Sequence, residues 1–187
     1  MQRVHSMIKK ILVIIFSLII TGLSPAFAEK SNMNDRFILE FIGEYGKAVE
    51  SCDKDAKNRI LPDVRHIEPI LQLSPDELRG FLIYKSGIAT KRCTELKSGY
   101  PIALLLFVAG SDKTSPQMRV VLDNLLKLLS SKHEIAAFYT YRSISIQKRN
   151  ELDAIEYFND PFDMLKVYYL VKEYQEIESG KNRPHQN

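Results

Sequence analysis

Over most of the chain, apolar residues recur at intervals of three and four, which is the period of an amphipathic α-helix and predicts an all-α protein. The first helix of this pattern starts near Asn34 or Asp35 and runs to about Lys57. Gly43 and Gly46 lie inside it, and their small size would let another helix approach closely. Its apolar face consists of Phe37, Ile38, Phe41, Ile42, Tyr45 and Val49.

Two serine–proline pairs mark the starts of later helices. The pair at 74–75 is followed by Glu77, and this glutamate, three residues after the serine, completes a capping box. Gly99 ends the helix that begins there. Residues 63–73, just before this capping box, form a short helix at best because a proline interrupts them. The pair at 115–116 starts another helix, with the apolar face Val120, Val121, Leu125, Leu128 and Leu129.

The C-terminal third of the chain is predicted to hold two more helices. The first spans His133 to Phe158, although residues 138–146 are rich in β-favouring side chains and partly alternate. A single strand without a partner leaves its backbone groups unsatisfied, so helix is the favoured interpretation. Asp160 caps the last helix, which runs from Pro161 to about Glu178.

Residues 100–110 contain an apolar run, Ile102 to Ala109, that has no polar face. The run is too short to cross a bilayer, which takes about 20 residues, and its leucines and alanines favour helix. In a soluble chain such a segment has to be surrounded by other elements. We therefore predict one domain over residues 29–178, a bundle of about five to six helices around this central apolar helix, followed by a disordered tail at 179–187.

The first 28 residues have the layout of a secretory signal peptide. Arg3, Lys9 and Lys10 precede an apolar run at 11–20, and a site of small residues ends at Ala28. Cleavage after Ala28 predicts a periplasmic or secreted protein with no stable membrane span. The alternative is an uncleaved membrane anchor, which the polar and helix-breaking residues after the apolar run disfavour.

The charge of the chain gives no evidence for a nucleic-acid partner. The sequence has 26 basic and 23 acidic residues, but three of the basic residues and none of the acidic ones lie in the leader, which leaves 23 of each sign. Lys85, Lys91, Arg92 and Lys97 make one predicted helix locally basic, and a solvated face accounts for that.

The two cysteines, Cys52 and Cys93, predict one disulfide, because an even number of cysteines in an exported chain indicates pairing. Cys52 falls late on the first helix and Cys93 falls late on the helix begun by the capping box, so the bond would join two long helices. Two free buried thiols are the alternative. A Cys–His metal site is disfavoured because neither cysteine has a second ligand at metal spacing.

We assign no residue to catalysis, to a cofactor or to a metal, because the sequence holds no motif with the spacing of such a site. His66 is the only nameable centre for an enzyme, since Asp63 and Glu68 lie close by and a histidine beside carboxylates can act as a base or a ligand. A surface histidine on a short helix is the simpler interpretation.

Tyr168, Tyr169 and Tyr174 are candidates for a partner-binding surface. The apolar residues of the last helix cover more than one narrow stripe, whereas a terminal helix needs to bury only one face, and tyrosine is enriched in interface cores. Coverage of both faces by the preceding helix is the alternative.

The sequence thus favours an exported helical protein that binds another protein, such as an inhibitor, immunity or adaptor protein. A small exported enzyme centred on His66 and a structural component of an envelope assembly are the two alternatives.

Overall fold

The computed structural model describes residues 33–110, 114–129, 132–178 and 180. The predicted leader lies outside these residues, as does the predicted tail apart from Gly180. Within them the chain forms eight α-helices and two short 3-10 helices and contains no β-strand, so the predicted all-α class is confirmed. The elements are α3 (Met33–Asn58), η1 (Val64–Ile67), α4 (Glu68–Leu71), α5 (Pro75–Ser98), α6 (Ile102–Ala109), α7 (Pro116–Leu129), α8 (Lys132–Ser143), α9 (Ile146–Asp153), η2 (Glu156–Asn159) and α10 (Met164–Glu178).

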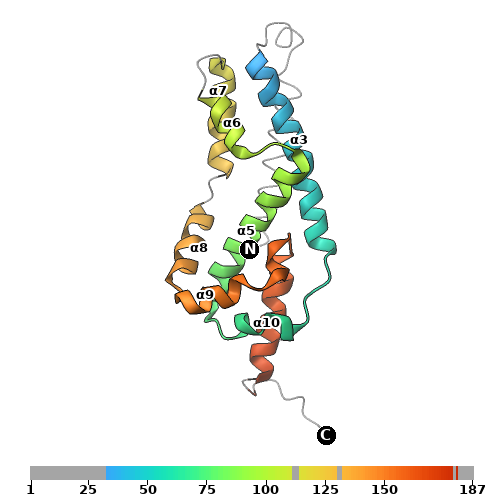
Figure 1. Ribbon diagram of the computed structural model, residues 1–187, viewed down its shortest axis with the longest axis vertical. Coiled ribbons are helices and arrows are strands. Elements are labelled where there is room, and N and C mark those ends of the chain that lie inside the picture. The colour runs from blue at the N-terminus through green and yellow to red at the C-terminus, as the bar shows by residue number, and fades with distance from the viewer. Residues whose placement is uncertain (1–32, 111–113, 130–131, 179, 181–187) are drawn as a thin grey trace.

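Helix α5 is the element around which the others are arranged, since it packs against α3, α8, α10 and η2 (Figure 1). Its start is the predicted capping box: the backbone N–H of Ser74 donates to Glu77 Oε2 over 2.9 Å, and the side-chain oxygen of Ser74 accepts from the backbone N–H of Glu77 over 3.4 Å. Its end is Gly99, in the left-handed conformation at φ 71° that favours glycine. Because neighbours cover several sides of α5, its buried residues do not form one narrow stripe.

The apolar run is helical as predicted, but its predicted central position is wrong. Helix α6 lies with α7 at one end of the molecule, beside the start of α3 (Figure 1). Leu105 is completely buried, whereas Leu106 is 48% exposed and Phe107 is 80% exposed. A helix of eight residues at the end of a bundle has neighbours on one side only, so the remaining apolar side chains face solvent.

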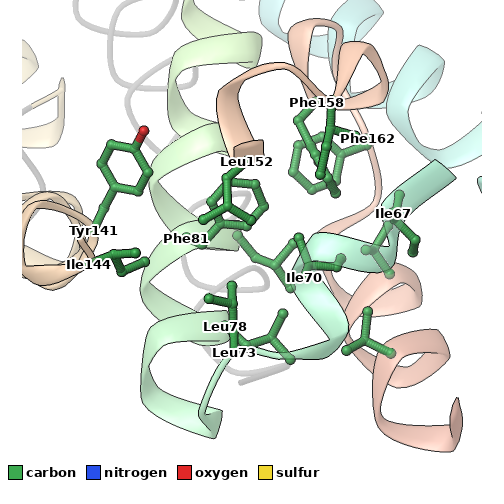
Figure 2. Packing of buried hydrophobic residues seen from close by; sticks show 14 residues of the cluster. Ile67, Ile70, Leu73, Leu78, Phe81, Tyr141, Ile144, Leu152, Phe158 and Phe162 are labelled. Carbon is green, nitrogen blue, oxygen red and sulfur yellow. The ribbon is translucent and has the colours of Figure 1, made fainter. Parts of the chain in front are cut away.

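Most of the buried hydrophobic residues in the described part of the chain fall into two separate clusters. The small cluster joins the N-terminal half of α3 to α6 and α7 and consists of Ile38, Phe41, Tyr45, Leu105, Met118 and Leu122. The large cluster joins η1, α4, α5, α8, α9, η2 and α10 (Figure 2). Its buried members are Ile67, Ile70, Leu73, Leu78, Phe81, Leu82, Tyr141, Ile144, Leu152, Ile155, Phe158, Phe162, Val167 and Val171.

The predicted single helix from His133 to Phe158 is wrong, because the chain breaks after Ser143. Ile144 turns into the large cluster, and the Ser145 side chain caps α9 by accepting from the backbone N–H of Lys148 over 3.3 Å. A short 3-10 helix, η2, then covers residues 156–159. A buried hydrophobic side chain and a serine cap together favour this break over a continuous helix.

The last helix also begins later than predicted, at Met164 and not at Pro161. The side chain of Asp163 accepts from the backbone N–H groups of Leu165 and Lys166, each over 3.1 Å. Asp163, and not Asp160, therefore satisfies the first free amides of α10.

Close helix contact occurs at a different glycine from those expected. A Cβ atom added at Gly43 or Gly46 would meet nothing within 4 Å, whereas one added at Gly80 would lie 2.6 Å from Thr140 Cγ2. The backbone of α5 therefore comes closest to α8 at Gly80.

Candidate functional site

The predicted disulfide is present and joins the two long helices α3 and α5. Cys52 and Cys93 are bonded with their Cα atoms 6.1 Å apart. Cys52 is completely buried. Cys93 is only partly buried and lines a surface groove, so the bond fixes α3 to the part of α5 that lines this groove.

This α3–α5 groove has a volume of about 670 Å³ and is open to solvent. The last turn of α3 forms one wall, the C-terminal half of α5 forms the floor, and residues 159–161 form the other wall. Its lining residues are Asp55, Asn58, Arg59, Ala89, Arg92, Cys93, Leu96, Lys97, Asn159, Asp160 and Pro161.

Two of the three basic side chains in the groove are held by neighbouring groups. Arg59 donates to the backbone oxygen of Asp160 over 2.9 Å and lies 4.3 Å from the ring centroid of Tyr157. Lys97 pairs with Asp55 and donates to the side-chain oxygen of Ser51 over 2.8 Å. Arg92 is exposed and makes no hydrogen bond or ion pair with any described residue. It is the one uncompensated cation among the groove residues.

His66 and its acidic neighbours are not assembled into a catalytic arrangement. The carboxylate of Asp63 is engaged by Arg65, with an Nη2–Oδ2 distance of 2.6 Å, and also accepts from the backbone N–H of Arg65. These hydrogen bonds hold the pKa of Asp63 well below its usual value. His66 and Glu68 are exposed, and no hydrogen bond joins them or joins the imidazole to Asp63 in the described part of the chain.

Three interacting polar side chains connect α5, α8 and α9 beside the large cluster. The ammonium of Lys85, whose side chain is only 11% exposed, lies 2.8 Å from Asp153 Oδ1, and the Tyr141 hydroxyl also bonds to Asp153. Burial raises the pKa of Tyr141, and its bond to the carboxylate raises it further. The Tyr84 ring stacks on Tyr141 with centroids 4.6 Å apart, so these groups act as a structural connection between the helices.

The three tyrosines predicted as a contact surface do not share one environment. Tyr168 packs partly against the large cluster, and its ring meets that of Tyr169 edge-on at 5.8 Å. Tyr169 is 67% exposed and Tyr174 is 38% exposed. Of the three, Tyr169 is thus largely accessible to a partner and Tyr174 is accessible in part.

Helix α6 exposes three large apolar side chains. Leu104, Leu106 and Phe107, which we call the α6 surface, are all exposed, and the helix carries no charged residue. On α7, Val120 is also exposed. The periodicity of the sequence did not predict this surface. An apolar run has the same sequence pattern whether other helices cover all of its sides or only one.

No family model, curated protein or solved structure matches the chain. Within the described ranges, no set of three or more histidine, cysteine or acidic side chains is placed to hold a metal ion. None of the described helices has both the length and the apolar content needed to cross a membrane.

Proposed function

We propose that the protein is exported and acts by binding another protein through the α6 surface. The observation that carries the proposal is that the most apolar helix described leaves Leu104, Leu106 and Phe107 in contact with water. Apolar area exposed in this way costs roughly 25 cal/mol per Å² relative to burial. Contiguous apolar patches on soluble proteins mark interaction sites for the same reason.

Export is supported by two features of the chain. Residues 1–28 follow the basic, apolar and small-residue order of a signal peptide. The Cys52–Cys93 disulfide is the kind of bond that persists in oxidising compartments such as the periplasm or the cell exterior.

Tyr169 and Tyr174 provide a second, weaker candidate surface at the other end of the molecule (Figure 1). Exposed Glu173 and Glu176 lie on the same helix. Charged residues are depleted from the dehydrated centres of interfaces, so α6 is better suited to that role.

The experiment uses the mature protein beginning at Glu29 as bait for envelope proteins, in wild-type form and with Phe107→Ser. Ile146→Ser is the matched control, because Ile146 is 70% exposed and α9 lies far from α6 (Figure 1). We expect a protein that the wild type and Ile146→Ser both retain and that Phe107→Ser loses. Calorimetry with the two purified proteins then measures the same dependence on Phe107 directly.

Two other outcomes would contradict the proposal. Flotation of the wild type, but not Phe107→Ser, with phospholipid vesicles would assign the α6 surface to a bilayer. Self-association in the ultracentrifuge that Phe107→Ser abolishes would assign it to a second copy of the chain.

A further inference from the structure

We propose that the α3–α5 groove is a second binding site, which takes a carboxylate group of an acidic peptide segment, with Arg92 as the recognising residue. This site does not depend on the α6 surface, and either can fail in experiment without affecting the other. Its volume of about 670 Å³ lies within the range of roughly 300–1,000 Å³ seen for ligand sites.

The charges of the groove select an anion. Both carboxylates that line the groove already form ion pairs. Asp160 pairs with Arg59 at an Nη2–Oδ2 distance of 3.5 Å, and Asp55 pairs with Lys97. The charge of Arg92 is left without a partner. The planar guanidinium offers two parallel N–H donors that fit a carboxylate. One uncompensated charge suits a carboxylate better than a phosphate group, which carries about −1.5 to −2.

The other lining residues favour a peptide over an isolated ion. Leu96 follows Arg92 by four residues on α5, so the two side chains lie on the same face, and Leu96 is 75% exposed. The side-chain amides of Asn58 and Asn159, on opposite walls, form no hydrogen bond with any described residue. An acidic residue beside an apolar one would meet Arg92 and Leu96 together, while its backbone could bond to the two amides.

The groove is also held in shape before any ligand arrives. The disulfide fixes α3 to α5 at its floor. Arg59 ties the end of α3 to the opposite wall by donating to the backbone oxygens of Asp160 and Pro161, over 2.9 and 3.3 Å. A preformed site loses less conformational entropy on binding than a flexible one.

The test measures fluorescence anisotropy of a labelled peptide, Gly-Leu-Glu-Leu-Glu-Leu-Gly, with the mature disulfide-bonded protein. We expect saturable binding that Arg92→Gln weakens about tenfold, the size expected for a lost charge-assisted hydrogen bond. Arg79→Gln is the matched control, because it removes the same charge from the other end of α5, and we expect it to change affinity less than about twofold. The same peptide with lysine in place of glutamate should not bind.

Titration of succinate, followed by NMR of the backbone amides, separates the two sources of a carboxylate. Peptide binding that depends on Arg92 assigns the groove to an acidic segment of a partner. Saturable succinate binding without peptide binding would overturn the assignment to a peptide segment and would assign the carboxylate site to a free small anion. The proposal is overturned if neither probe binds, or if Arg79→Gln weakens binding as much as Arg92→Gln does.

Discussion

Gly80 is where the backbones of α5 and α8 come into closest contact. A Cβ atom at this position would lie 2.6 Å from Thr140 Cγ2 and 2.7 Å from Thr140 Cβ. Both atoms belong to a β-branched side chain with little freedom to move away. The packing of α5 against α8 therefore requires the absence of a side chain at residue 80.

Gly80→Ala should destabilise the protein by about 1–3 kcal/mol, the usual cost of overpacking a contact between elements. Gly43→Ala is the control, because a Cβ there meets nothing within 4 Å, and its better helix propensity should stabilise by up to about 1 kcal/mol. Urea denaturation of both variants measures the difference. Equal unfolding midpoints for the two variants would contradict the close approach at Gly80.

Asp153 makes stability depend on pH in the acidic range. Burial raises the pKa of Asp153, but hydrogen bonds from Lys85 and Tyr141 and the charges of Lys85 and Arg149 outweigh burial and hold that pKa below its usual value. A carboxyl whose pKa is lower in the folded state stabilises the protein above its unfolded pKa of about 3.9, and loses that contribution as pH falls through the folded pKa.

The free energy of unfolding of the wild type should therefore fall between about pH 5 and pH 3 by more than that of Asp153→Asn, which cannot titrate. Asp76→Asn, which removes an exposed carboxylate 3.8 Å from Arg79 Nη1, is the control and should retain the steep fall of the wild type. Parallel curves for wild type and Asp153→Asn would show that the Lys85–Asp153 pair contributes nothing to acid stability.

At the scale of single helices, the sequence predicts best those features that depend on residues close together in the chain. The capping box at Ser74 and the glycine at 99 lie next to the backbone groups they satisfy, so the bounds of α5 follow from them. The break at Ile144 was missed because it depends on a buried contact with distant residues. The peripheral position of α6 was not predicted, because it depends on how many other helices pack around α6 in the folded chain.

The groove could not be predicted for the same reason. Its residues come from α3, α5 and the segment at 159–161, which are far apart in sequence. The sequence did show that Arg92 belongs to a locally basic helix, but not that the neighbouring cations are paired while Arg92 is not. Pairing of this kind is a property of the folded chain.

Substitutions on α6 test which of its sides is buried. Leu105 is completely buried in the small cluster, so Leu105→Ala should destabilise by about 2–5 kcal/mol. Phe107 is mostly exposed, so Phe107→Ser should change stability by no more than about 0.5 kcal/mol. Thermal denaturation of both variants gives the answer. A large loss with Phe107→Ser would mean that this residue, too, is buried in the folded protein.

At the scale of the molecule, the disulfide is the only covalent connection between α3 and α5 outside the chain itself within the described structure. Its removal should destabilise by about 2–4 kcal/mol, because the bond restricts the unfolded chain. Alanine at both Cys52 and Cys93 tests this by urea denaturation and avoids placing a hydroxyl at the buried position of Cys52. Reductant should lower the midpoint of the wild type and leave that of the double variant unchanged.

The separation of the buried residues into two clusters has a consequence for local opening of the native state. Among the described residues, the small cluster contains six buried side chains and draws on α3, α6 and α7, while α5, α8, α9 and α10 contribute their buried side chains to the large cluster. Helices α6 and α7 should therefore open without disrupting the rest of the fold, and their amide protons should exchange with deuterium far sooner than those of α5. A partner that binds Phe107 would then slow exchange across both helices, well beyond the residues it touches.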